Sequence, residues 1–290
     1  MTFLYQLLNG VQMGSIYALV ALGYSMVYGI VNLINFAHGD IIMVGSYCVW
    51  FLMTRLGVPV WVSIIASIVL CAVLGMLIEK VAYKPLRKSA RISLLITAIG
   101  VSLLLQNLIQ LIFLPDPRIF PNLFEGAIEL GDRQLSYTTI ITIVVSIILM
   151  VGLSILVNKT KMGKAMRAVS QDADAAQLMG INVNNTISFT FAVGSGLAAV
   201  AAVLYCSSYY TIQPTMGSML GLKAFVAAVL GGIGSITGAV IGGFAIGIVE
   251  TFTKGYISSQ LADAVVFGIL ILVLLIKPTG LMGKNTNEKV

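Results

Sequence analysis

The sequence is poor in charged residues. Lysine, arginine, aspartate and glutamate make up 10% of its 290 residues, whereas soluble domains carry about 25%. The chain has one histidine, His38, and three cysteines, Cys48, Cys71 and Cys206, without a Cys-x-x-Cys pair. These are too few ligands for a Cys/His metal centre, so no metal site is predicted. The composition also excludes disordered, coiled-coil and nucleic-acid-binding proteins, despite a net charge of +6.

Apolar residues are abundant instead, at 58% of the chain. A membrane-spanning helix needs about 20 mostly apolar residues. Runs of this kind cover residues 7–31, 58–82, 92–114, 138–157, 186–206 and 236–253, with a final run at 261–276. Two shorter runs, 41–54 and 221–230, predict bent spans or half-helices beside the irregular polar segments 32–40 and 207–218. We therefore predict an all-α polytopic membrane protein, one transmembrane domain over residues 1–290 with about nine membrane segments (roughly eight to ten).

The basic residues are clustered, and their positions predict the orientation of the chain. Lysine and arginine collect in the cytoplasmic loops of membrane proteins. Three groups occur: Lys80, Lys84, Arg87, Lys88 and Arg91; Lys159, Lys161, Lys164 and Arg167; and Lys277, Lys284 and Lys289. The loop at 115–137 is mainly acidic, with Asp116, Glu125, Glu129 and Asp132, and is predicted to be extracellular. The N-terminus is then outside and the C-terminus in the cytoplasm.

The two halves of the chain have a similar order of segments. The run 7–31 precedes an irregular segment and a short apolar run, and the oppositely directed run 186–206 does the same. An inverted repeat would produce this order, and transporters often contain one, although the residues of the two halves match poorly. Glycines four residues apart, such as Gly10 and Gly14 or Gly243 and Gly247, predict close packing between helices.

The loop at 158–185 is too long for a simple turn and contains its own helix signals. Residues 161–170 place apolar side chains at helical spacing. Asp172 suits an N-cap, residues 173–179 can form about two turns, and Gly180 fits the position after the helix end. The second helix carries the apolar residues Ala176, Leu178, Met179 and Ile181. This apolar stripe needs a partner, which is either another protein or the membrane domain of the chain itself.

This loop resembles the coupling segment of ATP-binding cassette (ABC) importer permeases. Asp174-Ala175-Ala176 followed by Gly180 is similar to the Glu-Ala-Ala-x-x-x-Gly motif, with Asp in place of Glu. The Ile-x-Leu-Pro that follows in maltose-type permeases is missing, because residues 182–186 read NVNNT. The loop looks instead like that of the branched-chain amino acid permease family. The positions that match are Gly163, Arg167, Ala168, Asp172, Ala175, Ala176, Gly180 and Ile181.

Further stretches carry the same resemblance over nearly the whole chain. They are residues 9–29 of the first span, the turn Ile34-Asn35-Phe36-Ala37-His38-Gly39-Asp40, the loop from Glu79 to Arg87, Lys223-Ala224-Phe225, residues 229–235 (VLGGIGS) and Lys277-Pro278-Thr279-Gly280. Within the family, the chain looks most like the first of the two permeases of a leucine, isoleucine and valine importer.

The resemblance implies a permease without catalytic activity or a cofactor, in the inner (plasma) membrane of a bacterium. No Gly-x-x-x-x-Gly-Lys-Ser/Thr nucleotide-binding loop is present, and Gly283-Lys284-Asn285 is the nearest fragment. The implied partners are two ATP-binding subunits, a paralogous permease that completes a heterodimer, and an extracellular (periplasmic) amino acid-binding protein. The ATP-binding subunits would contact Gly163, Arg167, Ala168, Asp172, Asp174, Ala175, Ala176, Gly180 and Ile181.

The segment 32–40 (NLINFAHGD) is the candidate translocation path. Its backbone groups cannot remain exposed to hydrocarbon, so it must line a cavity or be buried in protein. Asn35, Phe36, His38 and Gly39 are the candidate path residues. Asn35 and His38 either contact the solute or gate the path, or they only cap the ends of broken helices. Among the acidic residues, Glu79 is predicted to be solvated, and Glu250 is predicted to pair with Lys254 four residues later.

Other functions are left open by the residues alone. An ion-coupled secondary amino acid transporter would use Glu250, Asp263 or His38 for its ion, but would not need the helices at 158–185. A permease of the same family could carry urea or amides. An intramembrane enzyme is disfavoured, because no His-Glu-x-x-His or Gly-x-Ser-x-Gly arrangement occurs.

Overall fold

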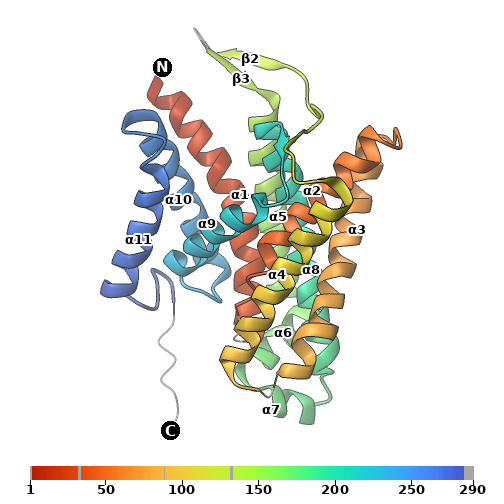
Figure 1. Ribbon diagram of the computed structural model, residues 1–290. Coiled ribbons are helices and arrows are strands. Elements are labelled where there is room, and N and C mark those ends of the chain that lie inside the picture. Colours follow the sequence, from red (N-terminus) through yellow and green to blue (C-terminus); the bar gives the residue numbers. More distant parts are fainter. Residues whose placement is uncertain (1, 32–33, 88, 131–132, 284–290) are drawn as a thin grey trace.

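The computed structural model describes residues 2–31, 34–87, 89–130 and 133–283. Lys88, Asp132, Lys284 and Lys289 of the predicted charged groups lie outside the described residues, as do the first two positions of the segment 32–40. Figure 1 shows a bundle of helices with a β-hairpin at one end and two short helices at the other.

The predicted membrane helices are present in the described part of the chain. Six helices are long and apolar enough to cross a membrane: α1 (Thr2–Val31), α3 (Val60–Ile78), α4 (Arg91–Phe113), α5 (Tyr137–Lys159), α8 (Val183–Tyr209) and α10 (Ile236–Tyr256). Three shorter helices join them: α2 (His38–Thr54), α9 (Met216–Gly231) and α11 (Ala262–Ile276). The all-α polytopic fold is therefore confirmed, and the nine helices agree with the predicted number of segments.

The helix α3 continues into a π-helical turn, η1 (Glu79–Tyr83), and a 3₁₀ turn, η2 (Lys84–Leu86). The prediction that Glu79 is solvated is wrong, because its side chain is buried. It forms an ion pair with Arg87 and accepts a 2.6 Å hydrogen bond from the Ser188 hydroxyl. Arg87, just after η2, and Ser188 on the distant helix α8 thus provide the partners that water was expected to provide.

The loop between α4 and α5 contains strands that the sequence did not predict. β2 (Ala127–Leu130) and β3 (Arg133–Ser136) form an antiparallel hairpin, with Ala127 opposite Ser136. β1 (Arg118–Ile119) pairs with β4 (Thr211–Ile212), which follows α8. Strands this short carry too few residues for a period-two pattern to be recognised.

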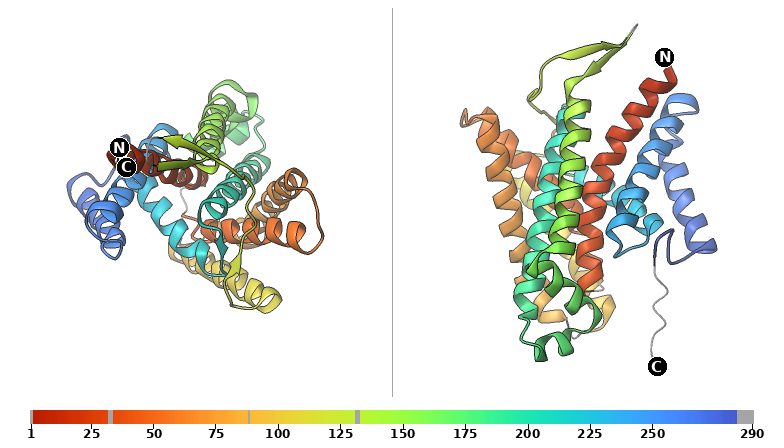
Figure 2. Two further views of the ribbon diagram at one scale, coloured as in Figure 1. Left: turned by 90° about the horizontal axis from the view of Figure 1, so that it is seen from above. Right: turned by 180° about the vertical axis from the view of Figure 1, so that it is seen from behind.

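The first helices of the two halves, α1 and α8, each pack against helices of the other half as well as their own. α1 contacts α9 and α10, while α8 contacts α2 and α3, and the two shorter helices α2 and α9 contact each other. α1 descends from the hairpin end in Figure 1, and α8 ascends toward it; the view from behind in Figure 2 shows the same opposition. This packing is what an inverted repeat of α1–α3 and α8–α10 would give.

Small residues allow the most extensive of these contacts, between α1 and α10. A Cβ atom on Gly247 would lie 2.1 Å from the Gly14 backbone nitrogen, and one on Gly243 would lie 2.5 Å from the Ala18 Cα. The close packing predicted from glycine spacing is therefore present. The centre of α1, from Ile16 to Leu22, is fully buried as a result.

Candidate functional site

Two broken helices meet inside the bundle. α2 begins at His38 and α9 begins at Met216; the first turn of α2 is buried, as are Met216 and Gly217 of α9. A Cβ atom on Gly39 would lie 2.4 Å from the Gly217 carbonyl oxygen, so the two backbones touch. The N-terminus of a helix carries a partial positive charge, and paired half-helix N-termini near the middle of the membrane are a recurrent way to hold anionic groups of a solute.

The predicted path residues gather at this junction. Asn35 is buried and accepts a 2.8 Å hydrogen bond from the Tyr83 hydroxyl, while Phe36 lies with its ring centroid 5.7 Å from that of Phe225. His38 packs edge-on against Tyr24, at 4.9 Å between ring centroids. The Asn35 Nδ2 and His38 Nε2 atoms have no hydrogen-bond partner among the described residues.

One amide on α4 joins the two half-helices. The Gln106 Nε2 group donates to the Asp40 Oδ1 atom of α2 at 2.9 Å and to the Ser218 hydroxyl of α9 at 2.8 Å. Asp40 is buried and lies in the first turn of α2, where a carboxylate complements the helix N-terminus. Movement of α4 would therefore act on both half-helices.

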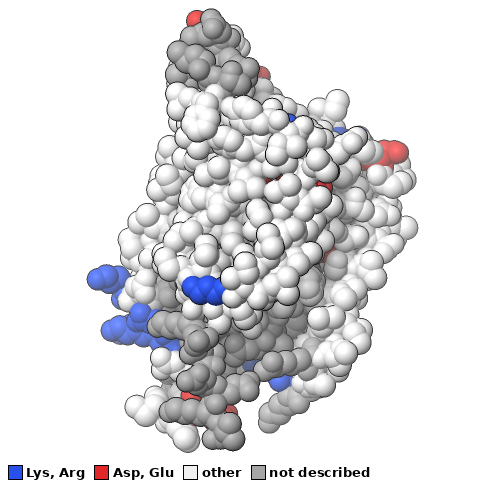
Figure 3. Space-filling model, turned by 90° about the vertical axis from the view of Figure 1, so that its left-hand side faces the viewer, with Lys and Arg blue, Asp and Glu red and all other residues white. Residues whose placement is uncertain are grey.

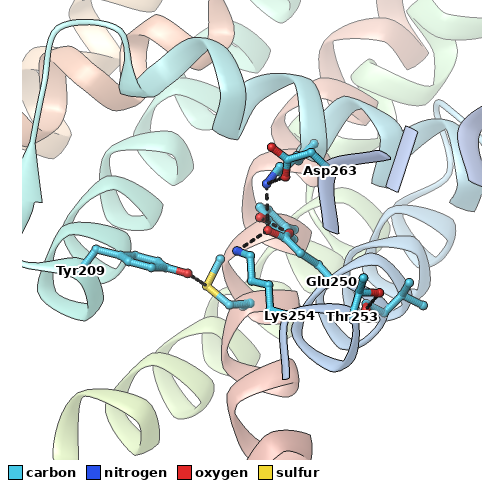
Figure 4. Close-up of polar contacts among 9 residues, drawn as sticks. Tyr209, Glu250, Thr253, Lys254 and Asp263 are labelled. Atoms are coloured by element: carbon cyan, nitrogen blue, oxygen red, sulfur yellow. Dashed lines mark hydrogen bonds and ion pairs between the residues drawn. The ribbon is translucent and has the colours of Figure 1, made fainter. Parts of the chain in front are cut away.

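A chain of alternating charges lies between α9, α10 and α11 (Figure 4). The predicted pair is present, with Lys254 Nζ 2.6 Å from Glu250 Oε1. Lys223 Nζ lies 2.8 Å from the same oxygen and 2.6 Å from Asp263 Oδ1. The Tyr17 hydroxyl of α1 also donates to Glu250, at 2.5 Å. The order Lys254–Glu250–Lys223–Asp263 leaves the chain of charges neutral.

Sequence reasoning did not give Lys223, Tyr17 or Gln106 a role at these sites. A signal for Lys223 was available, because a lone lysine in an otherwise apolar segment is costly unless it has a partner. Lys223 lies within an apolar helix of sixteen residues and is buried. Tyr17 and Gln106 gave no comparable signal, since both residue types occur often in helices without such contacts.

The predicted coupling residues lie together at the opposite end of the bundle from the β2–β3 hairpin, on or beside α6 (Lys161–Gln171) and α7 (Ala173–Leu178). Both expected helices are present. The Asp172 side chain caps α7 by accepting from the Ala175 backbone N–H at 2.9 Å. Gly180 follows α7 with a φ of 84°, a left-handed conformation that glycine adopts without strain.

α6 is fixed against the membrane helices, whereas the end of α7 is not. A Cβ atom on Gly163 would lie 2.2 Å from the Val157 carbonyl oxygen, so glycine allows α6 to lie against the end of α5. Arg167 donates to the Asn158 side chain at 3.2 Å, Ala168 is half-buried, and Asp174 is exposed. The helix pair is thus held in place by its first helix.

The apolar stripe of the second helix is partly exposed and partly buried. Leu178 is 88% exposed and Met179 is 84% exposed, while Ala175 is also exposed. Ala176 is only 4% exposed, because it faces the core of its own chain, and Ile181 is half-buried. Leu178 and Met179 therefore form the outward part of the stripe, and Ala176 is directed away from any partner.

Comparison with known proteins adds a family match to this geometry. The family model described as "Branched-chain amino acid transport system / permease component" matches residues 6–275. Two relatives are each 44% identical over 99% of this chain and 98% of their own length. They are the high-affinity branched-chain amino acid transport system permease proteins BraD of Pseudomonas aeruginosa and LivH of Escherichia coli K12.

A more distant relative and one solved structure are also similar. The probable branched-chain amino acid transport permease protein LivH of Methanocaldococcus jannaschii is 33% identical over 91% of this chain and 88% of its own. The structure of PsaBC from Streptococcus pneumoniae in complex with Fab has a TM-score of 0.51 and 17% identity, over 93% of this chain and 91% of the matched chain. The likeness to that structure extends to the fold alone.

Proposed function

This chain belongs to the branched-chain amino acid transport permease family, and we propose that it is a membrane subunit of an ATP-driven importer of leucine, isoleucine and valine. An extracellular binding protein delivers the amino acid, and a paralogous permease completes the membrane part. Two separate ATP-binding subunits supply the energy. The 44% identity to BraD and LivH over nearly the full length of the chain supports this substrate class, since both proteins are named as branched-chain amino acid transport permeases.

The observation that carries the coupling role is the exposure of Leu178 and Met179 on a braced helix pair. Burying each of these side chains against a partner would contribute about 1.5–3 kcal/mol to docking. Because α6 is packed against α5, force applied at α7 is transmitted to the membrane helices. We assign Leu178, Met179 and Ala175 to the contact with an ATP-binding subunit. Gly163, Asp172 and Gly180 shape the loop that presents them.

The charge distribution supports placing α6 and α7 in the cytoplasm. Lys159, Lys161, Lys164 and Arg167 lie at this end, and Lys80, Lys84 and Lys277 lie at the ends of α3 and α11. On the face shown in Figure 3, most Lys and Arg side chains gather in the lower half. By the positive-inside rule this end is cytoplasmic, and the N-terminal end of α1 is extracellular in the bacterial inner membrane.

The test replaces both exposed side chains, as Leu178→Asp with Met179→Asp. We expect the variant to insert normally but to lose the ATP-binding subunits on co-purification, with affinity weakened about 100-fold or more by the lost apolar burial. Amino acid uptake into proteoliposomes containing all subunits and the binding protein should fall in parallel.

The matched control is Ile119→Asp, which changes an equally exposed apolar residue (83%) in the loop at the other end of the bundle. This control should retain the ATP-binding subunits. Retention of both ATP-binding subunits by the double variant would contradict the assigned docking surface. Ion-driven uptake by this chain alone would contradict the importer itself and favour a secondary transporter.

A further inference from the structure

We propose that a cavity between the N-terminal half of α1 and helices α5, α8 and α10 is a receiving site for a free amino acid, with Lys254 binding the α-carboxylate. This inference rests on the proposed function and deepens it, because it names the chemical group that the chain recognises. The cavity is separate from the junction of α2 and α9 and from the coupling helices.

The cavity has the size and lining of a site for a small polar solute. Its volume is about 410 Å³, within the usual range of ligand pockets, roughly 300–1,000 Å³. Among the residues that line it are Asn9, Gln12, Thr139, Ser208, Tyr209 and Lys254. It lies toward the end of the bundle that carries the β2–β3 hairpin, which is the extracellular end in the proposed orientation.

A single amide forms a firm floor for the cavity. The Gln12 Nε2 group donates to the Ser208 hydroxyl of α8 at 2.7 Å, and Gln12 Oε1 accepts from the Thr139 hydroxyl of α5 at 2.9 Å. Below this layer the centre of α1 is fully buried. The site is therefore closed toward the cytoplasmic end, as a receiving site that precedes translocation should be.

The charge of the cavity wall selects for a carboxylate. Among the described residues that line the cavity, one side chain is charged, that of Lys254, and none is acidic. The Lys254 side chain is 37% exposed, and its ammonium group is paired with Glu250. A lysine ammonium has three donors, so N–H groups remain for a ligand. In Figure 4, Lys254 extends between Tyr209 and Glu250.

The neighbouring charges allow Lys254 to turn toward a ligand. If Lys254 releases Glu250, that carboxylate keeps Lys223 at 2.8 Å and the Tyr17 hydroxyl at 2.5 Å. No buried charge is then left unpaired, which avoids the usual cost of breaking a buried ion pair. A ligand carboxylate would then take the place of Glu250 as the anionic partner of Lys254.

The other end of a free amino acid also has partners in the cavity. The Gln12 Oε1 atom accepts one hydrogen bond in the structure, and a carbonyl oxygen can accept two. The face of Tyr209 offers a second place for an ammonium group. The aliphatic side chain need not be recognised here, because specificity among amino acids can come from the binding protein.

Polar groups continue from the cavity along one face of α5. Thr138 lines the cavity, and Thr142 and Ser146 follow it at four-residue spacing. All three hydroxyl oxygens are buried without a hydrogen-bond partner among the described residues. Leaving such groups unpaired costs free energy, so a state in which water or solute reaches this face would satisfy them. The receiving site thus lies beside a polar face of α5 that is closed in this structure and that a later state would open.

The experiment measures protection of a cysteine in the cavity. Asn9→Cys is introduced where Cys48, Cys71 and Cys206 have been replaced, and the complete transporter is labelled from outside with a membrane-impermeant thiol reagent. We expect L-leucine to slow the labelling and L-leucinamide, which lacks the carboxylate, to have no effect. Lys254→Met should weaken the protection about tenfold or more in leucine concentration, the effect of losing a charge-assisted hydrogen bond.

Lys254→Arg is the matched control, since it keeps the charge and should keep the protection. Gln6→Cys, another lining position, serves as the probe if Asn9→Cys fails to assemble. The proposal is overturned if neither cysteine is labelled from outside, if leucinamide protects as well as leucine, or if Lys254→Met keeps wild-type protection. Protection by ligand-free binding protein alone would assign the cavity to that protein and also overturn it.

Failure of this inference can be told apart from failure of the proposed function. The wild-type transporter is assayed for uptake of leucine under the same conditions. Uptake without leucine-dependent protection contradicts the receiving site only. Absence of any branched-chain amino acid uptake by the complete transporter contradicts the proposed function.

Discussion

At the scale of single residues, the membrane region is organised by a few ionisable side chains with several partners each. Glu250 accepts hydrogen bonds from Tyr17 of α1, from Lys223 of α9 and from Lys254 of its own helix. A carboxylate can accept several such bonds at once. Glu250 therefore joins α1 to the half-helix α9, and its removal should loosen both.

We expect Glu250→Gln to destabilise the protein by about 3 kcal/mol, because it leaves Lys223 with one partly exposed anion as partner. Unfolding of the purified complex on heating, followed by the loss of its monodisperse peak in size-exclusion chromatography, would show a melting temperature lower by several degrees. Lys254→Met, which removes the partly exposed member, should cost less than about 1 kcal/mol. Equal melting temperatures for Glu250→Gln and wild type would mean that this carboxylate is not a structural link.

At the scale of helices, the contact between α2 and α9 depends on glycine. Gly39 and Gly217 place the two backbones in contact, and a Cβ atom on Gly217 would lie 2.3 Å from the Gly39 carbonyl oxygen. No side-chain rotation can relieve a clash with backbone. The junction of the half-helices therefore tolerates no larger residue unless the two helices separate.

Gly39→Ala should consequently separate α2 from α9 and destabilise the protein by about 1–3 kcal/mol. The matched control is Gly152→Ala on α5, where a Cβ atom would meet nothing within 4 Å. That change should be neutral or stabilising by up to about 1 kcal/mol, since alanine favours a helix over glycine. Thermal stability of the two purified variants, measured side by side, tests the contrast. Similar stabilities would show that the half-helices are free to move apart.

At the scale of the whole molecule, the charged residues divide the bundle into two ends. The described basic residues of α6, η2 and the end of α5 lie opposite the loop that contains Glu125 and Glu129. The positive-inside rule predicts that the basic end lies in the cytoplasm.

Single cysteines at the two ends test this orientation. In a chain without native cysteines, Glu125→Cys should react with a membrane-impermeant reagent added outside intact cells. Lys84→Cys, at an exposed position of η2, should react only after the membrane is opened. Labelling of Lys84→Cys from outside, or of both from one side, would overturn the proposed topology.

The helices of this fold could be predicted from the sequence to within a few residues. Hydropathy over about 20 residues is a local property, and so the runs at 92–114 and 138–157 correspond closely to α4 and α5. The cap at Asp172 and the left-handed Gly180 are also local, because they depend on neighbours within four residues. The helices of the coupling loop were predicted for that reason.

The partners of buried polar groups could not be predicted in this way. Glu79 accepts a hydrogen bond from Ser188, which is 109 residues away, and Tyr17 donates one to Glu250, which is 233 residues away. Neither separation leaves a pattern in the sequence, because only the packing of helices brings these side chains together. The same reason applies to Gln106, which joins two half-helices, and to the residues that enclose the cavity around Gln12.

By itself, therefore, the sequence determined that this protein lies in a membrane, where its helices begin and end, and where the short helix α7 is capped. The tertiary structure decided which face of each helix is used. It directed Ala176 inward and Leu178 outward on one short helix, and it placed Lys254 at the wall of a cavity. Hydropathy and capping act within one segment, whereas the direction of a side chain depends on which segments pack around it.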